Sequence, residues 1–224
     1  MYIHPGWKKM LSNRVLSEIE NNRQKRKQKI ERFDTHISNN EIFNDLDYVF
    51  SHIEGYKKLY IKLFEDMSEF NFIKTSSVTD GNDNLKSDFG EVKLYNHTLN
   101  SFKQMVLLIN DNHDYQIQKD LYLLIALLHD FGKSHELCEY YKINLNDKHH
   151  IRSAIYFKKI IENNEEDYFG IDEASFKIIL NTLHTHHSLI NREEKETSFL
   201  IALKKADGSA RKLEKETLLK GSTK

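Results

Sequence analysis

Apolar residues recur at steps of three and four along most of this chain, and little in the sequence interrupts that spacing. The 224 residues include one proline, Pro5, so helices meet few enforced stops. After residue 40 the apolar positions are Ile42, Phe43, Leu46, Val49, Phe50, Ile53, Tyr56, Tyr60, Leu63, Phe64 and Met67. This spacing predicts one long helix with a single buried face, with Gly55 inside it. No segment sustains the two-residue alternation of a half-buried strand.

A loop divides the helical patterns into two parts. Residues 75–90, TSSVTDGNDNLKSDFG, are rich in Ser, Asp, Asn and Gly and predict a flexible loop. Further helices are predicted near residues 97–110, 117–129, 149–163, 172–186 and 196–218. We therefore predict an all-α chain with a helical N-terminal extension over residues 1–90, a helical domain over 91–218 and a tail over 219–224.

Composition narrows the class of protein. Apolar residues make up 39% and charged residues 30%, which is typical of a globular chain rather than a disordered one. The longest apolar run, Leu121 to Leu128, is too short to cross a bilayer, so we expect no membrane span. The first ten residues lack the apolar core of a signal peptide, and the single cysteine, Cys138, cannot form a disulfide within the chain. A cytoplasmic location is the expectation.

The apolar run ends abruptly in two groups that carry chemistry, His129 and Asp130. Burying an imidazole and a carboxylate at the end of an apolar segment costs hydration, and a divalent metal is a common compensation. Other candidate ligands lie near the beginning or end of predicted helices: His97, His149, His184, His186 and His187. Asp207 is a further candidate and follows the apolar run Phe199 to Leu203. Helix ends that meet around one point would bring these side chains into one cleft.

The order of these residues matches a known signature, H…HD…H…H…D. On that ground the chain resembles the HD-domain metal-dependent phosphohydrolases from His97 to Asp207. The sequence His-Asp-Phe-Gly-Lys, residues 129–133, fits the HDxGK variant that is typical of two-metal members. The resemblance implies a helical bundle, in agreement with the all-α prediction. The residues that come after His187 lack a GYP element, which argues against hydrolysis of cyclic di-GMP.

The resemblance also implies roles for individual residues. The first metal would be held by His97, His129, Asp130 and Asp207, and the second by the bridging Asp130 with His149 and His186, with His187 as a rival or additional ligand. Asp130 and Lys133 would be catalytic residues, and the Lys133 ammonium would face the substrate phosphate. Two divalent ions, whether Mn, Fe, Mg or Zn, would activate water for in-line attack on phosphorus.

We therefore predict a metal-dependent phosphohydrolase whose substrate is a small phosphorylated molecule, in the first place a nucleotide. Two alternatives remain open. A di-iron oxygenase would use the same ligands, and a nucleic-acid-associated accessory or regulatory domain would contact phosphates through the basic segment 23–29, RQKRKQK. The complete ligand set and Lys133 favour hydrolysis, and a homo-oligomer is compatible with each of the three functions.

Overall fold

The structure, a computed structural model, describes residues 39–78, 89–163, 169–187 and 196–221, with side chains from Asn44 onward. The basic segment 23–29, the middle of the predicted loop and the last three residues lie outside this description. The chain divides into two compact units, Met1–Asn44 and Asp45–Lys224, and the second unit contains all the predicted metal ligands.

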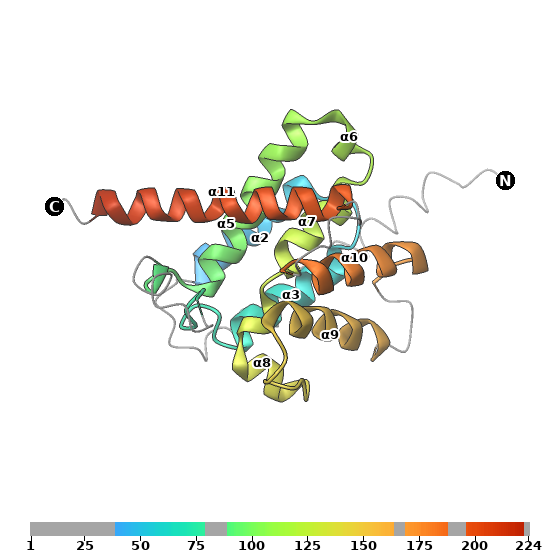
Figure 1. Ribbon diagram of the computed structural model, residues 1–224, viewed down its shortest axis with the longest axis horizontal. Coiled ribbons are helices and arrows are strands. Elements are labelled where there is room, and N and C mark those ends of the chain that lie inside the picture. Colours follow the sequence, from blue (N-terminus) through green and yellow to red (C-terminus); the bar gives the residue numbers. More distant parts are fainter. Residues whose placement is uncertain (1–38, 79–88, 164–168, 188–195, 222–224) are drawn as a thin grey trace, which may run out of the picture. The chain divides into compact units, whose positions relative to one another are not determined.

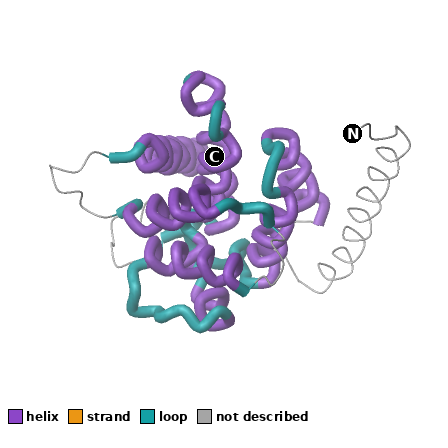
Figure 2. Tube along the Cα trace, turned by 90° about the vertical axis from the view of Figure 1, so that its right-hand side faces the viewer, coloured by secondary structure: helices purple, strands orange, loops and turns teal. Residues whose placement is uncertain are grey.

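The regular structure of the described residues is helical, which confirms the all-α prediction (Figures 1 and 2). The elements are α2 (Asn39–His52), α3 (Lys57–Glu69), α5 (Leu94–Asp111), α6 (His113–Gln116), α7 (Lys119–Leu128), the 3-10 helix η1 (Phe131–Lys133), α8 (His135–Tyr140), α9 (His149–Glu162), α10 (Glu173–Thr185) and α11 (Ser198–Gly221). Ser76, near the start of the predicted loop, forms an isolated β-bridge with Lys93, which follows the loop.

The apolar helix α7 lies at the centre of the bundle. Its residues from Leu121 to Leu128 are all buried, and it packs against α5, α10 and α11. Each fully buried leucine stabilises the fold by about 1.5–3 kcal/mol relative to an exposed one. Because the helix has no polar face, its C-terminal end also lies inside the protein. The position of that end brings the next two residues, His129 and Asp130, to a buried point.

The predicted long helix over residues 41–67 is wrong, because the structure breaks it into α2 and α3. Between them, Tyr56 adopts a left-handed backbone with φ of 53°. The backbone N–H groups of Glu54 and Gly55 donate instead to the carboxylate of Asp120, the closest pair being 2.6 Å apart. An acceptor outside the helix therefore takes donors that a continuous helix would use internally. The apolar periodicity continues through the break, so it could not reveal it.

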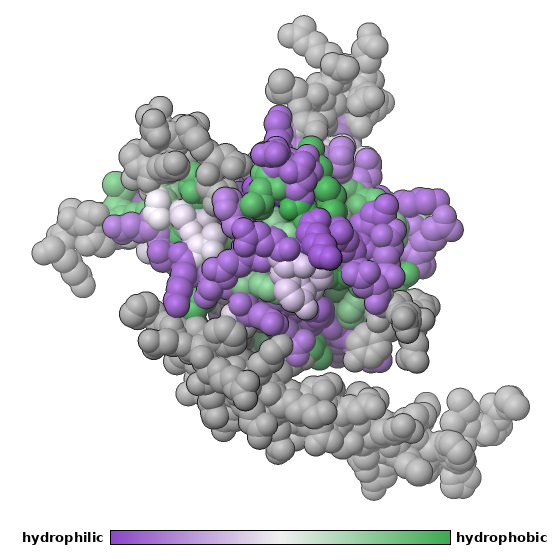
Figure 3. Space-filling model, turned by 90° about the horizontal axis from the view of Figure 1, so that it is seen from below, coloured by the Kyte–Doolittle hydropathy of each residue, from purple (hydrophilic) through white to green (hydrophobic). Residues whose placement is uncertain are grey.

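Polar and apolar side chains are interspersed on the face shown in Figure 3. Large exposed apolar residues are found on several elements, including Leu107, Ile117, Tyr140 and Leu219. Single exposed residues of this kind are ordinary on protein surfaces. None of the helices in the described ranges is both long enough and apolar enough to cross a membrane.

Candidate metal centre

His129 and Asp130 follow α7 directly, and backbone contacts fix their orientation. The Nδ1 atom of His129 lies 2.8 Å from the carbonyl oxygen of Ala126. A carbonyl oxygen can only accept, so Nδ1 donates and Nε2 faces the site. The hydroxyl of Ser153, on α9, donates to the carbonyl of His129 and accepts from the backbone N–H of Gly132, both at 2.8 Å. Ser153 thereby joins α9 to the turn that carries the two ligands.

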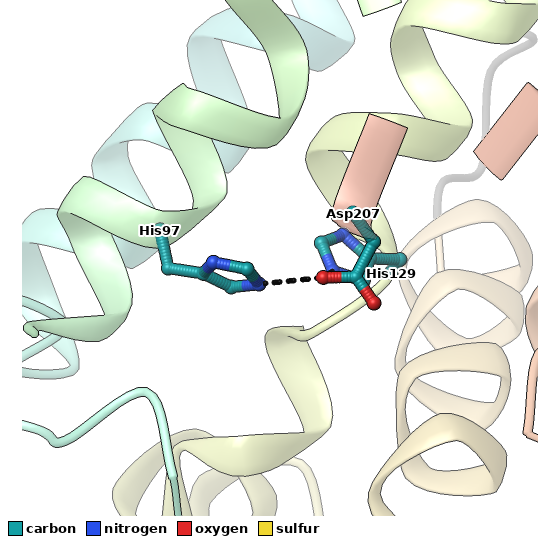
Figure 4. Close-up of side chains that lie close together, drawn as sticks. All are labelled: His97, His129 and Asp207. Atoms are coloured by element: carbon teal, nitrogen blue, oxygen red, sulfur yellow. Dashed lines mark ion pairs between the residues drawn. The ribbon is translucent and has the colours of Figure 1, made fainter. Parts of the chain in front are cut away.

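His97 reaches the same point from α5 and Asp207 reaches it from α11. The Nε2 atom of His97 lies 3.2 Å from Oδ1 of Asp207 and 3.3 Å from Oδ2 of Asp130. Figure 4 shows the side chains of His97, His129 and Asp207 pointing toward one another. One ligand atom from each of these three lies within 4.8 Å of the others, a spacing that one metal ion could bridge. We call this trio the inner group.

A second trio of candidate ligands contains Asp130 itself, and we call this trio the outer group. It consists of Asp130, His149 and His187, again with one ligand atom of each within 4.8 Å of the others. The Nε2 atom of His149, the first residue of α9, lies 3.6 Å from Oδ1 of Asp130. The two oxygens of Asp130 therefore face different groups, since Oδ2 lies toward the inner histidines and Oδ1 toward His149. This geometry suits a bridging carboxylate.

The two adjacent histidines that come after α10 lie in different places. His186 is buried, and its Nε2 atom lies 3.5 Å from Oδ2 of Asp207. Its ring centroid is 5.4 Å from that of His129, so it adjoins the inner group. His187 is exposed and joins the outer group. Of the pair left open by the sequence, the structure thus groups His187 rather than His186 with Asp130 and His149, while the ligand roles themselves stay a prediction.

Lys133 lies within the same site and contacts Asp130. Its ammonium is 2.6 Å from Oδ2 of Asp130 and 2.9 Å from the carbonyl oxygen of Ser77. The lysine is buried, so the contact partly neutralises the carboxylate in a place that water scarcely reaches. A contact of Lys133 with the substrate phosphate stays a prediction.

The electrostatics favour ionised carboxylates in this site. Burial raises the pKa of Asp130, but the charges of His129 and Lys133 outweigh it and hold the pKa well below the ordinary value. Burial also raises the pKa of Asp207. The neighbouring imidazoles of His186 and His97 lower this pKa by more, so it lies well below the ordinary value. Ionised carboxylates are the form that binds a metal ion.

The pKa values of the two buried imidazoles, His186 and His97, shift in opposite directions. For His186, burial lowers the pKa more than Asp207 raises it, which favours the neutral ring that a metal requires. For His97, burial lowers the pKa, but three carboxylates, those of Asp130, Asp207 and Glu214, raise it to about 9. The carboxylates around His97 therefore favour positive charge at this point, which a bound metal ion would supply.

The donor atoms fit a divalent metal ion. Within the described ranges, the buried atoms that have no hydrogen-bond partner include Nε2 of His97, His129 and His186 and the Oδ1 atoms of Asp130 and Asp207. Leaving buried polar atoms unpaired costs about 1–3 kcal/mol each, so such a cluster needs an explanation. Nitrogen and carboxylate donors suit Zn, Fe, Mn or Mg, and the one cysteine, Cys138, lies in neither group.

The fold and the two groups together define an all-α protein with two clusters of side chains that could hold divalent metal ions. A family model, the HD domain, matches residues 94–212. The chain therefore belongs to the HD-domain family, whose members are generally metal-dependent phosphohydrolases. Neither the search of curated proteins nor the search of solved structures found a match.

Proposed function

We propose that this protein is a metal-dependent phosphohydrolase that hydrolyses a nucleotide or a related phosphoester at a dinuclear centre. The observation that carries the proposal is the position of Asp130, whose two oxygens lie toward His97 and His149 at 3.3 and 3.6 Å. One carboxylate between two sets of donors is an arrangement that suits a pair of metal ions. Family membership supports the coarser part of the proposal, that the chemistry is phosphohydrolysis.

Each group would hold one ion. The inner group, with Asp130 added, would hold the first ion, and the outer group the second. Bound divalent ions would supply an acidified water and would neutralise the phosphoryl oxygens as charge develops on them. The protein's own contribution is to fix the donors: α7 is rigidly packed, and Ser153 joins its end to the start of α9.

Lys133 would contribute positive charge beside the reacting phosphoryl group. Its ammonium is held between Asp130 and the Ser77 carbonyl, and it can donate to a phosphate oxygen while it keeps contact with either partner, since an ammonium has three donors. No protein nucleophile is needed. Burial raises the pKa of the Cys138 thiol to about 11, so at neutral pH the thiol is not a nucleophile.

The test is phosphate release from a panel of nucleotides and phosphoesters with added Mn²⁺, comparing the wild type with Asp130→Asn. We expect activity on one substrate class and a loss of about 10³-fold in the variant, because asparagine would hold the two ions more weakly and their stabilisation of transition-state charge would be lost. Asp111→Asn is the matched control, since Asp111 is an exposed residue at the end of α5. It should leave the rate unchanged.

Two outcomes would contradict the proposal. Silence across the panel from a folded, metal-loaded protein would remove hydrolysis, and O2-dependent chemistry with an iron-loaded sample would then establish the oxygenase alternative. Activity that survives in Asp130→Asn would place the chemistry elsewhere in the chain.

A further inference from the structure

Glu214 on α11 contacts the inner group without belonging to it. It follows Asp207 by seven residues, two helical turns, and so lies on the same face of α11, which crosses α5 (Figure 1). Its carboxylate is buried, and Oε1 and Oε2 lie 3.0 and 3.2 Å from Nδ1 of His97. The residues that match the family model end at position 212, so Glu214 lies beyond them.

This contact fixes which nitrogen of His97 faces the centre. An ionised carboxylate can only accept, so Nδ1 carries the hydrogen and Nε2 is directed to Asp130 and Asp207. The two inner histidines therefore differ in their supports. His129 donates to a neutral backbone carbonyl, whereas His97 donates to a carboxylate. A carboxylate acceptor makes the imidazole a more basic, stronger metal ligand.

Glu214 is itself held in place by two further donors. The amide of Asn100, one turn after His97 on α5, donates to Oε1 at 3.1 Å. The guanidinium of Arg211 donates to Oε2 at 3.2 Å and also reaches the hydroxyl and carbonyl of Ser77. A buried carboxylate is costly unless such donors satisfy it. With them, Glu214 is held in one orientation against His97.

We propose that Glu214 is a positioning residue that sets the tautomer of His97 and strengthens metal binding at the inner group. The inference depends on the metal centre of the proposed function and assigns to it a residue beyond the ligand signature. Because Arg211 joins Glu214 to Ser77, and the Ser77 carbonyl also accepts from Lys133, the same contacts connect Glu214 to Lys133, which contacts the Asp130 carboxylate.

The test compares Mn²⁺ binding by calorimetry in the wild type and in Glu214→Gln. Glutamine has the size of glutamate but no charge, so we expect the tighter Mn²⁺ site to weaken by about 10-fold, at the lower end of the range for such supports. Glu216→Gln, the same change at an exposed position two residues away on α11, should bind Mn²⁺ like the wild type. Unfolding in EDTA shows whether each variant is folded.

Two further measurements separate positioning from a purely structural role. In the Zn²⁺-loaded protein, the Nδ1–H proton of His97 should give a downfield NMR signal that shifts upfield in Glu214→Gln. If that variant does not fold, Asn100→Ala decides the question, because it removes one donor from Glu214 and should weaken Mn²⁺ binding several-fold.

Equal Mn²⁺ affinities in the wild type and Glu214→Gln, with an unchanged His97 signal, would overturn this inference and leave the proposed function intact. A wild type that binds no Mn²⁺ or Zn²⁺ would overturn the metal centre of the proposed function, and this inference with it.

Discussion

The inner and outer groups share Asp130 but differ in how they are supported. In the inner group, the side chains of His97 and His129 are fully buried, and each donates from Nδ1 to a fixed acceptor, Glu214 or the Ala126 carbonyl. In the outer group, His149 begins a helix and its side chain is 13% exposed, less than the 21% of Asp207 in the inner group. The contrast lies in His187, which is exposed in the turn after α10.

This difference predicts different metal affinities. Ligands that are already ordered lose little conformational entropy when an ion binds, whereas an exposed side chain such as His187 must be ordered by the ion itself. We therefore expect the inner group to hold its ion tightly and the outer group to exchange its ion with the solution. A centre of this kind would keep one ion in place and leave the other side open to the substrate.

The largest expected effect is the difference between His129→Ala, in the inner group, and His149→Ala, in the outer group. Loss of His129 should release the tightly held ion and lower activity by about 10³-fold, because metal and transition-state stabilisation are lost together. His149→Ala should keep the inner ion through dialysis and lose the outer one. The measurement is metal content by mass spectrometry beside phosphate release. Identical metal contents in the two variants would show that the groups form a single site.

The next effect concerns Lys133, whose ammonium is 2.6 Å from Oδ2 of Asp130. Lys133→Met leaves a buried carboxylate without its cation, so in EDTA the free energy of unfolding should fall by about 3 kcal/mol. Added Mn²⁺ should recover much of this loss, because the ion neutralises Asp130 instead. Urea unfolding with EDTA and with Mn²⁺ measures both.

A matched control for Lys133 is Lys158→Met. The Lys158–Glu162 pair is exposed, with side chains 51% and 57% accessible, and such pairs contribute at most about 1 kcal/mol. If Lys133→Met loses the same stability with and without Mn²⁺, then Lys133 stabilises the fold through packing rather than through the charge of Asp130.

The sequence predicted the fold class well because that prediction depends on local pattern. The apolar run Leu121–Leu128 is buried as one helix, as its composition indicates. The break between α2 and α3 could not be predicted, because it depends on Asp120, which is 65 residues from Gly55 in the chain. Contacts over such a separation leave no trace in periodicity.

The site shows the same division between local and distant information. The ordered signature indicated which histidines and aspartates to examine, and the structure brings together His97 on α5, His129 just after α7 and Asp207 on α11. Glu214 was not predicted, since it lies in the stretch RKLEKETLLK among charges that resemble a solvated helix face. The available signal was the spacing of seven residues between Asp207 and Glu214, which puts both on one face of a helix. That spacing indicates a contact with His97 only once α11 is known to pack on α5.

The smallest expected effect tests whether the outer group depends on close packing between η1 and α9. A Cβ added at Gly132 would overlap the carbonyl oxygen of His149 and lie 2.6 Å from the backbone nitrogen of Ser153. Gly132→Ala should therefore displace the start of α9 and lower the free energy of unfolding by about 1–3 kcal/mol. It should also weaken the outer ion, because His149 is the first residue of that helix.

Gly208→Ala on α11 is the matched control, since nothing lies within 4 Å of a Cβ there. Inside a helix this change should stabilise the protein by about 0.5–1 kcal/mol. Urea unfolding gives both stabilities, and Mn²⁺ calorimetry of Gly132→Ala gives the two affinities. If Gly132→Ala weakened binding of the inner and the outer ion equally, the displacement of α9 would also reach His129 through Ser153. The two groups would then respond to a change in packing as one unit, and the inner group would not be independent of the outer one.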